Sequence, residues 1–155
     1  MTNQEILQCA LQQSAIDSHC EPEDFLRSEN IIVVSEKNEN ARRYLTLPFA
    51  CNLVSYGSNV VASVQEELRD TVRRYIEKYP VEHLFETPNM QVINTALMEH
   101  GLQVCFMAEY FLPDRTVLKD LPCAYEMRIL EQKDFEALYV PEWSNALCAD
   151  RKHLD

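Results

Sequence analysis

Glycine is almost absent from this chain, since Gly57 and Gly101 are the only two in 155 residues. Loops that bind phosphate groups through backbone N–H groups need several glycines close together, because a Cβ atom would keep the anion away. No part of the sequence offers such a loop. The composition therefore argues against a nucleotide or coenzyme pyrophosphate site of this kind.

Long apolar runs are also missing, and no basic segment followed by an apolar stretch comes after Met1. A membrane-spanning helix needs about 20 consecutive apolar residues. A signal peptide begins with a basic region ahead of a shorter apolar one. Neither pattern is present, so we expect a cytoplasmic protein without a membrane segment.

Basic residues are too few to balance the acidic ones. Fourteen Lys and Arg stand against 25 Asp and Glu, which gives a net charge of −11. Such a charge repels nucleic-acid backbones and anionic membranes, so neither is an expected partner. The apolar fraction of 46% suits a folded domain with a core of its own.

Closely spaced cysteine pairs are missing as well, and no histidine stands near a cysteine except in the adjacent pair His19-Cys20, which cannot chelate well. No metal site is predicted. We expect reduced thiols that are mostly buried, with Cys51 and Cys105 in the cores of strands. The six cysteines are Cys9, Cys20, Cys51, Cys105, Cys123 and Cys148.

What the sequence does contain is a set of clear helix signals. Thr2 and Glu5 form a capping box in front of an apolar stripe, and Ser63 and Glu66 are predicted to form a second one. Behind it, Leu68, Val72, Tyr75, Ile76 and Tyr79 recur at helical spacing. A later helix is predicted to open at Thr87-Pro88 and to end at Gly101.

Strands are predicted between these helices. The β-branched run 31–34 suits a buried strand, and segments 51–56 and 59–64 flank Gly57-Ser58 as in a type II′ hairpin. Residues 102–112 give the longest strand, and 125–130 alternate as another. The predicted fold class is α/β (α+β), with a mixed, mostly antiparallel sheet flanked by helices.

This order of elements resembles the GNAT family of N-acetyltransferases without its first strand, in which two helices precede three antiparallel strands. The helix and long strand ending in EYFLPD, and the segment 125–147 with its string PEWSNALC, are similar to a group of bacterial GNAT proteins. The resemblance implies a degenerate GNAT-like domain at 1–113, a linker at 114–124 and, at 125–155, the opening strand and helices of a second GNAT domain.

The departures from the GNAT pattern concern the cofactor. Where the family has a glycine-containing loop for the pyrophosphate of acetyl-CoA, this chain has Gln65-Glu66-Glu67, whose carboxylates would repel the anion. Leu97 stands where the family often has a tyrosine as general acid, and Leu102 replaces a phenylalanine. We therefore expect no cofactor and no catalytic residue in this chain, although acetyl-CoA is expected for the intact family.

Trp143 and Asn145 are the candidate substrate-binding residues, because the resemblance places them on the helix beside the acceptor substrate. A packing tryptophan and a surface amide are the simpler alternative. His100 is interpreted as a residue that stabilises a helix end. His83 and Glu86 would meet only if their segment is helical.

Two functions are compatible with these features. The chain is either the amino-terminal portion of a GNAT-like N-acetyltransferase that acts on a small amine and is inactive alone, or a non-catalytic dimerisation or partner-binding module. A homo-oligomer is expected in both cases, because an incomplete sheet leaves an open edge and the apolar side chains of 125–155 need cover.

Overall fold

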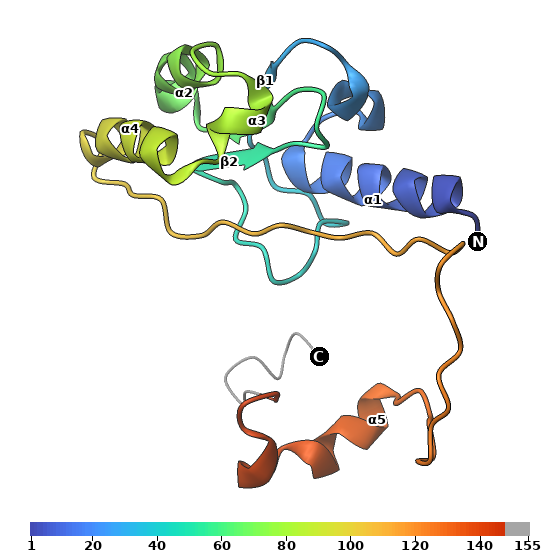
Figure 1. Cartoon of the computed structure of the whole chain (residues 1–155). Helices are drawn as coiled ribbons and strands as arrows, with labels where there is room; N and C mark the ends of the chain where they lie inside the picture. The colour runs from blue at the N-terminus through green and yellow to red at the C-terminus, as the bar shows by residue number, and fades with distance from the viewer. Residues whose placement is uncertain (148–155) are drawn as a thin grey trace. The chain divides into compact units, whose positions relative to one another are not determined.

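The computed structural model describes residues 1–147, and the chain forms two units, Met1–Thr116 and a second one that begins at Val117 (Figure 1). Each unit is described by itself. The first contains a three-stranded sheet with helices on both faces, and the described part of the second contains short helices and no strand. The fold is therefore mixed helix and strand, of the α+β class. None of the helices described is long and apolar enough to cross a membrane.

Helix α1, Asn3–Ser18, begins as predicted. The Thr2 hydroxyl accepts a hydrogen bond from the backbone N–H of Glu5, and the Glu5 carboxylate accepts one from the N–H of Thr2. The predicted apolar stripe is only partly buried, because Leu7 remains 36% exposed. Contact with the sheet is made by Leu11 and Ala15, which pack with Phe25 of the 3₁₀ helix η1, Pro22–Leu26, and with Val61.

The sheet consists of β1, Ile31–Val34, β2, Cys51–Val54, and β3, Val61–Val64, in the order β1-β3-β2. Strand β3 pairs in parallel with β1 and antiparallel with β2. The expectation of three successive antiparallel strands is therefore wrong. The long connection 35–50 carries the chain past β3 to the far edge, and β3 then returns into the middle.

The hairpin between β2 and β3 is wider than predicted. Its last backbone pair is Val54 with Val61, so residues 55–60 form the turn instead of Gly57-Ser58 alone. The buried Asn59 side chain donates hydrogen bonds to the carbonyls of Asp24 and Glu29, which draws this part of the chain out of the ladder. Gly57 does adopt the predicted positive φ, at 104°.

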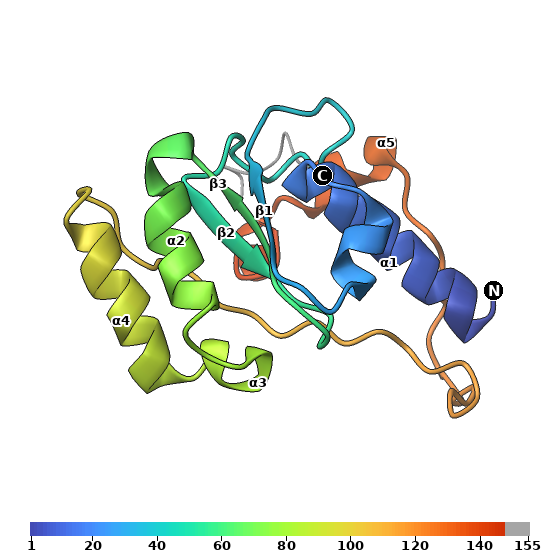
Figure 2. The same cartoon turned by 90° about the horizontal axis from the view of Figure 1, so that it is seen from above.

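One face of the sheet is covered by η2, Glu66–Leu68, α2, Arg69–Ile76, α3, Val81–Leu84, and α4, Thr87–Met98, while α1 covers the other (Figure 2). The predicted stripe is confirmed from Leu68 to Ile76, whose members are at most 5% exposed, whereas Tyr79 lies beyond the end of α2 and is only partly buried. The capping box at Ser63 is wrong. Ser63 lies inside β3 and is fully buried, so its hydroxyl does not reach a helix end.

Helix α4 opens at Thr87-Pro88 as predicted, and Gly101 follows its end with a φ of 71°. The long strand predicted for 102–112 does not form. Only Leu102 and Val104 of this stretch pack against the core, and the chain then runs on as an extended trace (Figure 1). Strand propensity alone is insufficient, because a strand also needs a partner, and the described part of the chain supplies none here.

The second unit contains α5, Gln132–Phe135, η3, Glu136–Leu138, and η4, Pro141–Trp143. The strand predicted at 125–130 is wrong, since its apolar members Tyr125, Met127 and Ile129 are 83%, 79% and 96% exposed. No hydrophobic side chain is fully buried among the residues described in this unit. The helix predicted after Trp143 is a turn up to Leu147, and its remainder lies outside the described residues.

Candidate functional site

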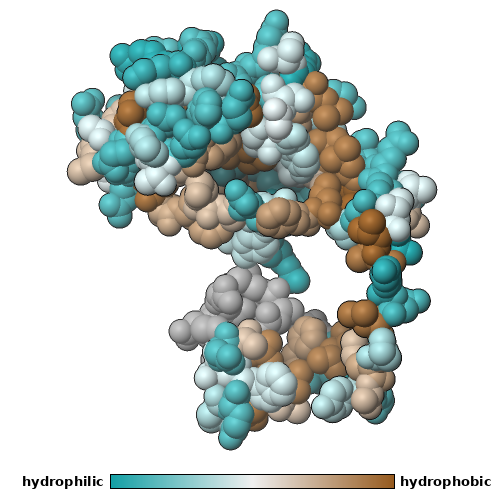
Figure 3. Space-filling view, viewed as in Figure 1, coloured by the Kyte–Doolittle hydropathy of each residue, from teal (hydrophilic) through white to brown (hydrophobic). Residues whose placement is uncertain are grey.

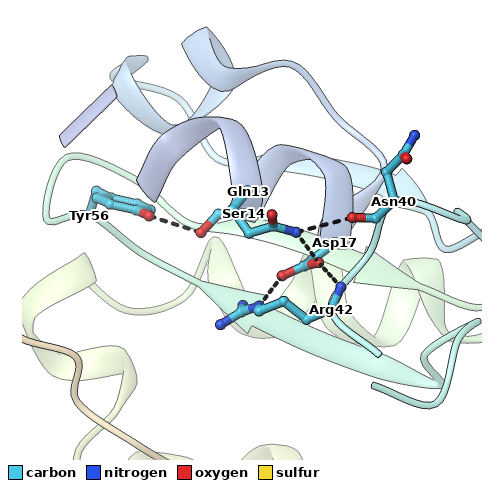
Figure 4. Close-up of polar contacts among 6 residues, drawn as sticks. All are labelled: Gln13, Ser14, Asp17, Asn40, Arg42 and Tyr56. Carbon is cyan, nitrogen blue, oxygen red and sulfur yellow. Dashed lines mark hydrogen bonds and ion pairs between the residues drawn. The ribbon is translucent and has the colours of Figure 1, made fainter. Parts of the chain in front are cut away.

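A polar cluster of the first unit lies at the end of α1, around Asp17 (Figure 4). Its carboxylate is only 3% exposed and accepts three hydrogen bonds. One comes from the Arg42 guanidinium, one from the Arg42 backbone N–H at 3.0 Å, and one from the Gln13 side chain at 3.0 Å. The Gln13 amide also reaches the carbonyl of Asn40 at 3.4 Å.

This arrangement holds the loop 35–50 against α1 and offers no proton chemistry. The groups that face the buried Asp17 carboxylate are N–H donors, so it serves here as a structural acceptor. Burial lowers the pKa of the Arg42 guanidinium, but the hydrogen bond and charge of Asp17 outweigh it and raise the pKa above its usual value. Ser14 and Tyr56 share a hydrogen bond of 2.8 Å beside the cluster and tie the hairpin to the same helix.

A shallow surface depression includes His19 and Cys20, which the sequence places side by side. Burial and the negative charges of Asp24 and Glu21 raise the pKa of the Cys20 thiol to about 12. A neutral thiol is neither a nucleophile nor a good metal ligand. The His19 ring lies 3.2 Å from the carbonyl oxygen of Val34, which fixes its Nδ1 as a structural contact.

His83 and Glu86 do meet, although only His83 lies in a helix, α3, while Glu86 stands in the turn between α3 and α4. The ring Nδ1 lies 2.8 Å from the Glu86 carboxylate, and both side chains are 52% exposed. The hydrogen bond and charge of Glu86 raise the pKa of His83 above its ordinary value. The pair lacks a third ligand, since the described residues contain no group of three or more metal-binding side chains. His100, just after α4, is exposed.

The cysteines differ from the sequence-based expectation of burial. Cys9, Cys105 and Cys123 are exposed, and Cys105 is not part of a strand. Cys51 lies in β2 as predicted, and burial raises the pKa of its thiol to about 12. The described cysteines are free thiols, and Cys148 lies outside the described residues.

The two predicted substrate residues both belong to the second unit. Trp143 closes η4 with 54% of its side chain exposed, and Asn145 follows in a turn and is also exposed. An exposed indole beside an exposed amide can contact a ligand or another protein. The role of Trp143 and Asn145 in substrate binding stays a prediction.

The feature that sequence reasoning missed is residues 105–112, called here the extended segment. Its large side chains lie in solvent, with Phe106, Tyr110 and Phe111 exposed by 73%, 72% and 86%. Brown apolar side chains follow the lower rim of the first unit in Figure 3, where Figure 1 draws this segment. The aromatic residues of this stretch are visible in the sequence, but they belong to the residues predicted to form the long strand 102–112. Patches of this kind mark interaction surfaces more often than catalytic ones.

The geometry of the described residues thus combines a structural ion-pair cluster, a surface His–Glu pair and the apolar surface of the extended segment. Comparisons with protein families, with curated proteins and with solved structures found no match for this chain.

Proposed function

We propose that this chain is a non-catalytic module that associates with another protein surface through the extended segment. The observation that carries the proposal is the exposure of Phe106, Tyr110 and Phe111 on a stretch of backbone outside the sheet. Leaving one such side chain in water costs about 1.5–3 kcal/mol relative to burying it. A protein surface that accepts this segment as an added strand would gain both the apolar contacts and the backbone hydrogen bonds.

The charges at the start of the central helical stretch support a non-catalytic role. Glu66 and Glu67 open η2 with no glycine nearby, and the Glu66 carboxylate is already paired with Arg69. An anion at this end of η2 would meet two carboxylates instead of free N–H groups. The first unit therefore has no support for a bound acetyl-CoA at the position that the GNAT resemblance suggests.

A GNAT-like N-acetyltransferase is the second candidate, in which this chain would be a part that is inactive alone. It is favoured by one observation, that α4 is followed by Gly101 and an extended stretch at the place where the family has a helix, a glycine and a strand. The parallel pairing of β1 with β3 departs from that pattern. Acetyl-CoA and a small amine acceptor would be the ligands of such an enzyme.

Two measurements test the proposal. Hydrogen exchange on the full chain at about 1 µM, where weak complexes are dissociated, should show unprotected amides from residue 105 to residue 112. Protection at this concentration would mean that the chain covers its own segment, which contradicts the proposed function. Calorimetric titration with acetyl-CoA should show no binding, and micromolar affinity would favour the acetyltransferase instead.

A further inference from the structure

We propose that the partner of the extended segment is a second copy of this chain, and that the two segments pair as antiparallel strands around a two-fold axis at Ala108. The inference rests on the proposed function and adds the identity of the partner and the register of the pairing. It is carried by how the segment is held, by its unpaired backbone and by its residue order.

The segment is fixed at both ends. At its start, the backbone N–H of Val104 donates to the side-chain oxygen of Asn94 at 2.7 Å. Just beyond its end, the Asn3 side chain donates to Asp114 at 2.7 Å and accepts from the backbone N–H of Arg115 at 2.8 Å. These contacts belong to one unit. A stretch held in this way is ordered before it binds, so association costs less conformational entropy than ordering a free tail.

Between these anchors the backbone is free to pair. From residue 105 to residue 112, no N–H or C=O group hydrogen-bonds to any other group in the part of the chain that the structure describes. The eight residues thus present the unsatisfied polar groups of an edge strand. Exposed apolar side chains next to such an edge favour pairing with a second strand.

The residue order is self-complementary in one register. Two identical antiparallel strands are related by a two-fold axis perpendicular to the sheet. Opposing residues point to the same face, so the axis must pass beside a residue that lies opposite its own copy. With Ala108 at the centre, Phe106 lies opposite Tyr110 of the second copy, and this aromatic pair occurs twice. Cross-strand aromatic pairs are among the most stabilising in sheets.

The neighbouring registers are less favourable. A centre at Glu109 places two carboxylates directly opposite each other, which is destabilising. A centre at Met107 sets Phe106 against Ala108 and loses both aromatic pairs. Ala108 is therefore the centre that the side chains select.

The expected complex is weak. The exposed parts of Phe106, Tyr110 and Phe111 amount to roughly 450 Å² in each copy, taking about 200 Å² for a whole aromatic side chain. Met107 and Leu112, which are 54% and 45% exposed, extend this area. The total over two copies lies near the lower limit of about 1,200 Å² for specific interfaces. A dissociation constant of roughly 10–100 µM is expected, so the dimer is largely dissociated at about 1 µM.

Charge exchange at position 108 tests the register. Because Ala108 is exposed and would face itself across the axis, Ala108→Asp and Ala108→Lys should each leave the monomer folded. Each should raise the dissociation constant up to about fivefold, since like charges then oppose each other. An equimolar mixture of the two variants should restore association to the wild-type level or better. The measurement is sedimentation velocity of the full chain over a concentration series.

Ala124→Asp and Ala124→Lys are the matched controls, because Ala124 is equally exposed but lies outside the segment. They should associate like the wild type, alone and mixed. Failure of Ala108→Asp and Ala108→Lys to rescue each other, or equal effects of the substitutions at Ala124, would overturn the register.

A crosslink gives an independent readout. In a chain with Cys9, Cys105, Cys123 and Cys148 changed to Ser, Ala108→Cys should form a disulfide-linked dimer under mild oxidation. The control chain keeps Ala108 and has Cys105 in place of the serine. It should form no such dimer, because the two Cys105 thiols are then six residues apart along the ladder, a separation of about 20 Å. If the amides of residues 105–112 exchange freely at about 1 µM and the chain still sediments as a monomer at roughly 200 µM, the self-pairing is wrong. The proposed function would still stand in that case.

Discussion

Replacing Asp17 by Ala should destabilise the first unit and release its long loop. The substitution removes an acceptor of three hydrogen bonds, two from Arg42 and one from Gln13. All three donors then need new partners. The Arg42 side chain is 36% exposed, so water can replace part of its lost bond, and its contribution must be discounted.

The magnitude follows from the remaining terms. A hydrogen bond to a charged group contributes about 1.5–3 kcal/mol when it is buried and about 1 kcal/mol when water competes for it. Counting the solvent-screened guanidinium bond at about 1 kcal/mol and the two buried bonds at about 1.5 kcal/mol each gives roughly 4 kcal/mol. Asp17→Asn should cost less, about 1–2 kcal/mol, because its amide oxygen can still accept from the Arg42 N–H and from Gln13.

The assay is urea denaturation followed by circular dichroism, with hydrogen exchange as the local readout. The substitution should speed up amide exchange more in residues 35–50 than in α2, because Asp17 connects that loop to α1. Glu39→Ala is the matched control, since Glu39 lies exposed in the same loop, and it should leave the denaturation midpoint unchanged. A free energy of unfolding for Asp17→Ala within about 0.5 kcal/mol of the wild-type value would show that the cluster does not hold the loop.

Three other outcomes follow from the structure. Gly57→Val should lower the free energy of unfolding by about 1–3 kcal/mol, because φ is 104° at this position. An added Cβ would meet no atom within 4 Å, so backbone strain is the only cause of the loss, and an unchanged denaturation midpoint would refute this. The pKa of His83 measured by NMR should lie above 6.5 and should fall towards 6.5 in Glu86→Gln. Because the pKa is raised in the folded state, the His83–Glu86 pair stabilises the fold fully below pH 6.5, and this contribution is lost as the pH rises through the folded pKa. At about pH 8, Cys51 should resist alkylation while the exposed Cys9 reacts, because a pKa of about 12 leaves little thiolate; equal rates would contradict the burial of Cys51.

Local signals in the sequence determined the helices. The capping box at Thr2 and Glu5, the apolar spacing from Leu68 to Ile76 and the stop at Gly101 all act within a few residues. Their hydrogen bonds and side-chain contacts close inside the segment itself, so the sequence alone carries the information. The three short strands were also identified, because β-branched runs bounded by turn residues are local patterns too.

Tertiary structure alone decided how the strands pair and which apolar residues are covered. Ser63 looks like a helix cap in sequence, but pairing with both neighbours places it in the middle of β3. Residues 102–112 and 125–130 have strand-like alternation, yet they stay outside the sheet because a strand forms only where a distant segment supplies its hydrogen bonds. The exposure of Phe106 and Phe111, on which the proposed association rests, depends on that missing partner and could not be read from the residues themselves.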